Sequence, residues 1–485
     1  MGDLPIGLSF DDVLLVPQRS AILPSDVDVT TSLGAGISLN IPIISSAMDT
    51  VTEDGLAIAL AREGGIGVIH RNMSIQKQVD MVAKVKRSEN TVIEDPFTVR
   101  ADISILALKE IMEQRGVNGF PVVDEQGLLL GMVTSRDIWY VEDPEAPVSR
   151  AMTPSEKLIS APKSTSLDEA RRILYRNRIE KLPLVDEGGK LVGLITAQDI
   201  DKREKFLSAA KDTNGRLRVG GAIGVGEDCF ERAAGVIGAG ADALFIDAAT
   251  GHTDRVIRLV EKLSSEGDTP VVAGNVVTEE GAKDLISAGV SAVKVGVGPG
   301  SICTTRVISG VGTPQFSAVQ NVAAACRKKG VSVIADGGIR YSGDLVKAIA
   351  AGADVVMMGS LLAGCRESPG AMVNFQGRSW KEYRGMGSLK AMRKGSGDRY
   401  GQNSSGKLVA EGVEGRVPYR GPLADTVFQL MGGLRSGMGY VGAEDLPSLR
   451  ERAKFIRITP GGLRESHAHD ITITEEPVNY QVTGI

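Results

Sequence analysis

Cysteine, histidine and long apolar runs are scarce in this sequence, and each scarcity excludes a class of protein. Its 485 residues contain four histidines and four cysteines, which are Cys229, Cys303, Cys326 and Cys365. No two cysteines stand in C-x-x-C spacing, which argues against a zinc or redox pair and against a secreted disulfide framework. No apolar run reaches the roughly 18 residues that a membrane span needs. The N-terminus carries early acidic residues and has no signal-peptide pattern.

Positive charge is not concentrated either. The net charge is −5, and no cluster of basic residues exceeds three, which argues against a nucleic-acid-binding surface. We therefore expect a cytoplasmic protein with reduced thiols that binds neither nucleic acid nor membrane. The hydrophobic fraction of 42% is enough for a sizeable core. The length allows two or three domains, or one large barrel with a smaller domain.

An internal repeat is the clearest feature that is present. Residues 97–138 align without a gap with residues 159–200, and Pro121 matches Pro183. Each copy predicts a helix, two short strands and a turn, so that two copies bury each other's apolar faces. The pair, which we place at 93–202 with copies at 93–150 and 151–202, resembles a tandem of cystathionine-β-synthase-type (CBS) modules. That resemblance implies a cleft for regulatory adenine or guanine nucleotides.

Short apolar stretches alternate with amphipathic helical ones on both sides of the repeat, in residues 1–92 and 203–485. This alternation is typical of parallel βα units. Eight strands are predicted, within residues 41–49, 64–72, 219–225, 242–252, 270–278, 291–300, 331–338 and 354–360. We predict an α/β fold, a (β/α)8 barrel split by the repeat pair. A doubly wound open sheet is the alternative, but its G-x-G-x-x-G fingerprint is absent, since Ser301 replaces the last glycine in GVGPGS.

Polar and glycine-rich segments follow the predicted strands. In a barrel the carboxyl ends of the strands form the active face. The segments there are Ser45–Ser46, Asp247, Asn275, 296–303, 336–338 and Gly359–Ser360. The two late glycine-rich turns predict a phosphate site made of backbone N–H groups, although glycines in tight turns alone are the alternative.

Cys303 stands in the stretch VGVGPGSICTTR, residues 295–306. A lone cysteine is most often a small buried residue. Here glycine, proline, serine and threonine surround it and Arg306 follows, an environment that lowers a thiol pKa and favours a nucleophile. We interpret the other three cysteines as ordinary buried residues.

Residues 384–415 are rich in glycine, serine and charge and have few apolar side chains. Such a segment buries itself poorly, so we predict a mobile lid over the barrel mouth. An inert surface loop is the alternative.

Several motifs lie along the chain: LSFDDVLLVP, ISSAMDTVTE, AGNVVT, VGVGPGSICTTR, IADGGIR, VMMGSLLAG, YRGMGS, GDRY and LRESHAHD. Over essentially its whole length the chain resembles the bacterial inosine-5′-monophosphate dehydrogenase family. The resemblance implies oxidation of inosine 5′-monophosphate (IMP) by NAD⁺ and water to xanthosine 5′-monophosphate (XMP) and NADH, toward guanine nucleotides. It assigns Cys303 as the nucleophile at purine C2, and water later hydrolyses the covalent intermediate under the lid.

The resemblance also assigns binding residues. Asp336 would hold the ribose hydroxyls, and Ser360 with the glycine turns the phosphate. The IMP set is Ser301, Asp336, Gly338, Gly359, Ser360, Tyr383, Gly385, Met386, Gly387 and Glu411. The NAD set is Asp247, Asn275, Gly296 and Gly298. A monovalent cation, usually potassium, is assigned to Gly298, Gly300 and Cys303, completed by Glu465, Ser466 and His467 of a neighbouring subunit. This sharing implies a homotetramer, and an octamer through the CBS pair stays open.

In the lid, Arg399 and Tyr400 match a dyad that activates water, supported by Thr305 and Glu411. Arginine is ordinarily protonated in proteins. Two mechanisms therefore stay open: the closed site lowers the pKa of Arg399, or Arg399 acts electrostatically while Thr305 and Glu411 move the proton.

Two other functions stay open beside the dehydrogenase. GMP reductase shares the cysteine loop but is expected to lack the CBS insert and the Arg-Tyr lid. A nucleotide sensor on a non-catalytic barrel would have lost Cys303 or the dyad. This sequence has all of these features, which favours the dehydrogenase.

Overall fold

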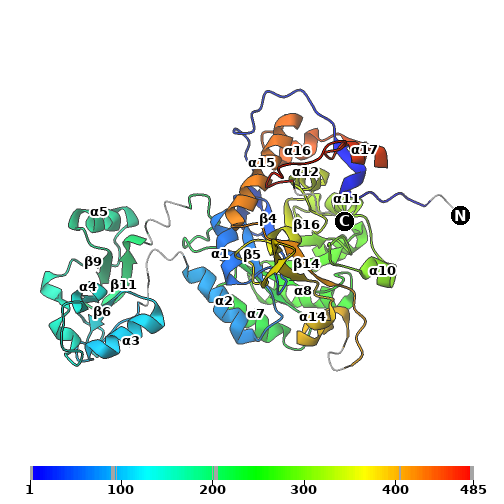
Figure 1. Cartoon of the computed structure of the whole chain (residues 1–485). Helices are drawn as coiled ribbons and strands as arrows, with labels where there is room; N and C mark the ends of the chain where they lie inside the picture. The colour runs from blue at the N-terminus through cyan, green and yellow to red at the C-terminus, as the bar shows by residue number, and fades with distance from the viewer. Residues whose placement is uncertain are drawn as a thin grey trace. The chain divides into compact units, whose positions relative to one another are not determined.

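The computed structural model describes residues 4–88, 93, 96–198, 200, 206–402 and 406–480. The chain forms two compact units, one of Met1–Ser88 with Ser208–Ile485 and one of Glu89–Leu207 (Figure 1). The domain boundaries predicted at 92 and 203 lie outside the described residues, as do lid residues 403–405.

The larger unit is built on a closed barrel of eight parallel strands, in the order β12-β13-β14-β15-β16-β17-β4-β5. Each strand lies within one of the eight predicted stretches, so the barrel is confirmed and the open sheet is wrong. Strand β4 pairs with β17 as well as β5, which brings residues from both sides of the insert together. The strands are β4 (Ile43–Ser45), β5 (Ile66–Ile69), β12 (Val219–Ile223), β13 (Ala243–Ile246), β14 (Val271–Val276), β15 (Ala292–Val295), β16 (Ser332–Asp336) and β17 (Val355–Met358).

Helices cover the barrel, and hydroxyl side chains cap several of them. Thr253 and Thr278 each accept a hydrogen bond from a backbone N–H of the first turn, which fixes where α8 and α9 begin. Apolar strand side chains such as Ile44, Phe245 and Ile334 fill the interior below the mouth. The principal helices are α1 (Asp54–Arg62), α2 (Ile75–Arg87), α7 (Cys229–Gly238), α8 (Asp254–Glu266), α9 (Glu279–Ser287), α11 (Gln315–Arg327), α12 (Ser342–Ala351), α15 (Leu423–Val441) and α16 (Leu446–Arg452).

Shorter elements complete this unit. The antiparallel sheet β18-β19-β20 flanks the lid, because β19 ends where the lid begins and β20 begins where it ends. These elements are β1 (Val13–Leu15), which pairs with β21 (Phe455–Arg457), β18 (Met372–Phe375), β19 (Arg378–Arg384), β20 (Glu414–Pro418), α10 (Thr305–Ser309), α13 (Ser360–Ala363), α14 (Leu389–Lys394) and α17 (Pro460–Glu465). Within the described part of the chain, no helix combines the length and apolar character needed to cross a membrane.

The smaller unit confirms the internal repeat. In the first copy α3 (Ile105–Arg115) precedes β6 (Gly119–Val123) and β7 (Leu129–Thr134). In the second copy α5 (Leu167–Asn177), β10 (Lys181–Val185) and β11 (Leu191–Thr196) occupy the matching positions. Each copy has its own apolar cluster, and the two β-turns exchange hydrogen bonds, from Leu129 N to Gly189 O and from Leu191 N to Gly127 O. The copies therefore join through reciprocal main-chain contacts.

Candidate active site

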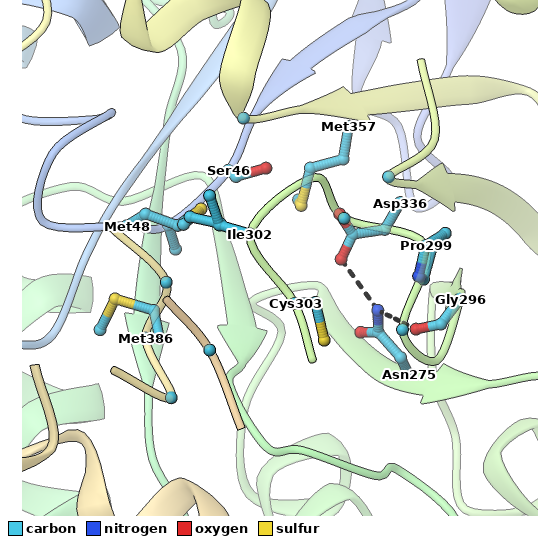
Figure 2. Close-up of a pocket in the computed structure, with 18 of the residues that line it drawn as sticks. Ser46, Met48, Asn275, Gly296, Pro299, Ile302, Cys303, Asp336, Met357 and Met386 are labelled. Atoms are coloured by element: carbon cyan, nitrogen blue, oxygen red, sulfur yellow. Dashed lines mark hydrogen bonds between the residues drawn. The ribbon is translucent and has the colours of Figure 1, made fainter. Parts of the chain in front are cut away.

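One cavity opens at the carboxyl ends of the barrel strands (Figure 2). It is lined by every residue that the family resemblance assigns to catalysis, IMP or NAD: Asp247, Asn275, Gly296, Gly298, Ser301, Cys303, Thr305, Asp336, Gly338, Gly359, Ser360, Tyr383, Gly385, Met386, Gly387, Arg399, Tyr400 and Glu411. Gly300 lines it too, whereas Glu465, Ser466 and His467 lie elsewhere, at the end of α17.

Cys303 lies between the barrel and the base of the lid. Its Sγ donates a hydrogen bond to Thr305 Oγ1 at 3.2 Å, and its side chain is half-buried. The backbone N–H of Thr304 donates to the carbonyl of Glu411 at 3.0 Å, and Val413 N–H donates to Ile302 O at 3.0 Å. The loop of residues 296–304, here called the Cys303 loop, is therefore paired along its end with the last residues of the lid.

Close packing explains two glycines of the Cys303 loop. A Cβ on Gly296 would lie 2.4 Å from the carbonyl oxygen of Asp336, and one on Gly298 would lie 2.5 Å from Cγ of Arg306. Both glycines have positive φ, +139° and +79°. The Arg306 guanidinium donates from Nε to Val297 O at 2.9 Å. Arg306, which was predicted to be a cation that activates the thiol, thus also holds the backbone of the Cys303 loop in place.

A chain of hydrogen bonds fixes the polar floor of the cavity. Asn275 donates from Nδ2 to Asp336 Oδ2 at 2.9 Å and to Gly296 O at 2.8 Å (Figure 2). Lys294 Nζ donates to Asn275 Oδ1 at 3.0 Å, which sets the orientation of the amide. Burial lowers the pKa of Lys294, and the carboxylates of Asp336 and Asp247 oppose that shift. Sequence reasoning missed Lys294, although a lysine within an apolar barrel strand was a usable signal.

The three other cysteines are buried, and none forms a disulfide. Burial raises the pKa of Cys326 to about 12 and that of Cys365 to about 11. Thiols of this kind are protonated at neutral pH and inert. Their interpretation as ordinary buried residues is confirmed.

The described part of the lid is folded over the mouth of the barrel. Helix α14 buries Ala391 and Met392 completely, and a 3₁₀ helix, η4 (Ser396–Tyr400), follows it. Ser396 Oγ donates to Met386 O at 2.6 Å, which ties η4 to the cavity wall. Tyr383 at the end of β19 is also buried; burial raises its pKa, and a hydrogen bond with Ser301 opposes this.

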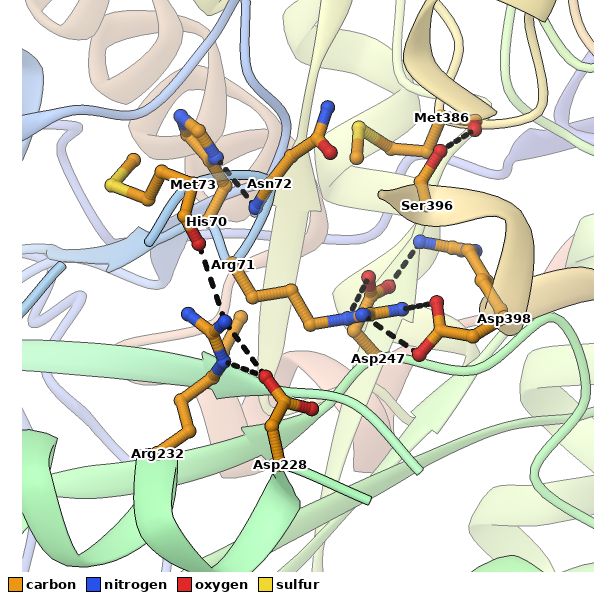
Figure 3. Close-up of polar contacts among 12 residues, drawn as sticks. His70, Arg71, Asn72, Met73, Asp228, Arg232, Asp247, Met386, Ser396 and Asp398 are labelled. Atoms are coloured by element: carbon orange, nitrogen blue, oxygen red, sulfur yellow. Dashed lines mark hydrogen bonds and ion pairs between the residues drawn. The ribbon is translucent and has the colours of Figure 1, made fainter. Parts of the chain in front are cut away.

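Two arginines and two aspartates meet where η4 covers the barrel (Figure 3). Arg399 forms an ion pair with Asp247, and Arg71 Nε donates to the other Asp247 oxygen at 3.2 Å. Burial alone would raise the pKa of Asp247, but Arg399 and Arg71 outweigh it and hold that pKa below its usual value. Burial would lower the pKa of Arg399, but Asp247 raises it above its usual value. Sequence reasoning also missed Arg71, whose signal was a charged residue two positions after the end of β5.

Comparisons with known proteins show the family to which the chain belongs. A family model described as "IMP dehydrogenase / GMP reductase domain" matches residues 7–469. The chain is 57% identical over 480 residues to the inosine-5′-monophosphate dehydrogenase of Aquifex aeolicus, covering 98% of both chains. It is 52% identical over 480 residues to that of Bacillus subtilis, again covering 98% of both. The chain belongs to the inosine-5′-monophosphate dehydrogenase family. The predicted family is thereby confirmed.

A solved structure shows that a GMP reductase has the same fold as this chain. A cysteine-to-alanine variant of GMP reductase from Trypanosoma brucei, in complex with guanosine 5′-monophosphate, superposes with a TM-score of 0.91 at 41% identity. The match covers 97% of this chain and 99% of that chain, so it includes the region of the insert. The expectation that GMP reductases lack the insert is therefore wrong. The insert does not separate the two activities, and the residues of the cavity and lid must do so.

Proposed function

We propose that this enzyme oxidises IMP to XMP with NAD⁺, and that Cys303 is the nucleophile that bonds to purine C2. The observation that carries the proposal is the meeting of Cys303, Asp336 and Arg399 in one cavity at the barrel mouth. Two inosine-5′-monophosphate dehydrogenases, which are 57% and 54% identical to this chain over 98% of its length, support the proposal.

The substrate would lie across the late strands. The Asp336 carboxylate, held by Asn275, is suited to accept hydrogen bonds from ribose hydroxyls. The backbone N–H groups of the glycine turns after β16 and β17, with Ser360 and Ser301, would bind the phosphate. Tyr383, Gly385, Met386, Gly387 and Glu411 would enclose the base and the rest of the nucleotide.

The chemistry would proceed in two steps at one carbon. The Cys303 thiol gives up its proton, its Sγ adds to the C2=N3 double bond, and the hydride on C2 then leaves with its electron pair, which restores that double bond. NAD⁺, when bound beside Asp247 and Asn275, supplies the acceptor for that hydride. Water then adds to C2, the S–C2 bond breaks, and the two protons of the water pass to N3 and to sulfur, so that XMP is released and the Cys303 thiol is regenerated. Thr305, which accepts a hydrogen bond from Sγ, and Glu411, whose backbone is paired with the loop, would transfer the protons.

Arg399 would act as a cation in the second step. Its ion pair with Asp247 raises its pKa, so that the guanidinium stays protonated in this closed arrangement. Of the two mechanisms left open by the sequence, this favours the electrostatic one, in which Thr305 and Glu411 move the proton. Tyr400, whose pKa burial raises, would donate a hydrogen bond to the attacking water.

The closed lid and the cofactor would use the same carboxylate. Arg399 contacts Asp247, which the family resemblance assigns to NAD. A ribose hydroxyl therefore reaches Asp247 only after Arg399 withdraws. The cofactor would bind with the lid open, and the lid would close after the cofactor leaves.

A monovalent cation would bind the backbone of the Cys303 loop. Among the described residues no group of three or more His, Cys, Asp or Glu could hold a metal, and carbonyl oxygens are the donors that potassium prefers. The Gly300 carbonyl accepts the Cys303 N–H at 3.0 Å and keeps a second lone pair. Gly298 and Cys303 would supply the other carbonyls.

The assembly and its regulation are proposals of the same kind. Glu465, Ser466 and His467 of a neighbouring subunit would complete the cation site in a homotetramer, with an octamer as the larger alternative. Adenine or guanine nucleotides would bind the CBS pair and regulate the barrel. We expect the enzyme to work in the cytoplasm.

The direct test measures NADH absorbance with purified protein, IMP, NAD⁺ and potassium, beside Cys303→Ala and the control Cys229→Ala. We expect NADH from the wild type and the control and none from Cys303→Ala. Consumption of NADPH with GMP, without NADH from IMP, would instead assign the reductase activity. Nucleotide binding without either activity would identify a sensor.

A further inference from the structure

Arg71 binds two carboxylates at once, and one of them belongs to the lid. Its Nη1 donates to Asp398 Oδ2 at 3.0 Å and its Nη2 to Asp398 Oδ1 at 2.8 Å, while Nε donates to Asp247 (Figure 3). The Arg71 side chain is 7% exposed and that of Asp398 31%. Such a two-point contact fixes direction as well as distance.

The arrangement pairs two consecutive lid residues with two residues of the barrel. Asp398 and Arg399 come from η4, whereas Arg71 follows β5 and Asp247 follows β13. The four charges alternate in sign and sum to zero. Because both lid residues are engaged, η4 can neither rotate nor slide without breaking one of the pairs.

The charges are also satisfied when the lid is away. Arg71, which contacts Asp247 in the closed arrangement, would keep that partner, so that no unpaired cation would stay buried in the barrel. Asp398, already partly exposed, is hydrated by solvent. Neither state carries a buried unpaired charge, which is what a lid that alternates between two positions requires.

We propose that Arg71 and Asp398 are positioning residues that hold the lid closed, with Arg399 on Asp247, while the covalent intermediate is hydrolysed. The inference rests on the proposed function. Weakening this pair shifts the lid toward its open position. Hydride transfer takes place with the lid open, so its rate is unchanged, whereas hydrolysis becomes slower. The cofactor also competes less with Arg399 for Asp247.

The test is Asp398→Asn in the full-length enzyme, mixed rapidly with IMP and NAD⁺. The loss of one charge-assisted pair predicts a steady-state rate about tenfold lower. The first burst of NADH should stay within about twofold of wild type, because it precedes lid closure. The apparent affinity for NAD⁺ should rise, and acid quenching should recover a larger fraction of enzyme with nucleotide covalently attached.

Two further variants separate positioning from general damage to the lid. Asp398→Glu keeps the charge and should restore part of the steady-state rate. Lys390→Gln removes an exposed lid ion pair with Glu414 and should match wild type. Two results for Asp398→Asn would overturn the inference. One is a fall in the NADH burst that matches the fall in the steady-state rate, and the other is a steady-state rate equal to that of wild type. The absence of any NADH from the wild type would refute the proposed function itself, and the inference with it.

Discussion

Replacing Gly298 with alanine tests whether the glycines before Cys303 are needed for packing of the loop. The new Cβ would lie 2.5 Å from Cγ of Arg306, at a backbone φ of +79°. Cγ belongs to the stem of a side chain that donates hydrogen bonds to Val297 O and Thr313 O, so it does not swing aside freely. Positive φ costs a non-glycine residue about 1–2 kcal/mol, and overpacking costs about 1–3 kcal/mol.

Gly310→Ala is the matched control, because Gly310 has a similar φ of +73° and no atom within 4 Å of its Cβ position. We expect Gly298→Ala to lose about 2–5 kcal/mol and Gly310→Ala about 1–2 kcal/mol. If the loop shifts to relieve the clash, Cys303 moves, and the rate of NADH formation falls about thirtyfold or more. Thermal unfolding and the rate of Cys303 alkylation measure both effects. Equal rates and equal stabilities for the two variants would refute the packing argument.

Three other predictions follow from the buried charges and thiols. Lys294→Met removes the donor to Asn275 Oδ1, so NADH formation should fall about tenfold or more, with a stability change below about 3 kcal/mol; an unchanged rate would mean that Asn275 is held without it. The lowered pKa of Asp247 contributes its full stabilisation of the fold above about pH 4, and this contribution is lost as the pH falls through the lowered pKa. The difference in unfolding temperature between wild type and Asp247→Asn should therefore become smaller at acidic pH. Alkylation at neutral pH, mapped by mass spectrometry, should modify Cys303 well before Cys326, and the reverse order would contradict the burial argument.

The barrel was predictable because its strands are local in the sequence. A parallel strand covered on both faces must be a short apolar run, and each of the eight is bounded by turn residues. The repeat was predictable for a similar reason, since its helices and strands recur at the same spacing. Cys303 could be singled out because its glycines and its hydroxyl neighbours stand beside it in the chain.

The charge pairs were not predictable from local pattern. Arg71 and Asp398 are 327 positions apart, and Arg399 and Asp247 are 152 apart. Only closure of the barrel brings the ends of β5 and β13 under η4. Composition also understated the order of the lid, because two apolar residues of α14, Ala391 and Met392, are fully buried.

The shared carboxylate of Asp247 gives a physical reason for the order of the two chemical steps. A buried guanidinium without a partner costs several kcal/mol, so Arg399 enters the cavity only when Asp247 is free to receive it. In the proposed mechanism, a cofactor bound to Asp247 would therefore keep Arg399 out until the hydride has been transferred. Because Asp398 enters together with Arg399, closing the lid adds no net charge to the cavity. In the proposed mechanism the geometry of the two ion pairs would then determine lid closure, and water would be activated only after the cofactor has left.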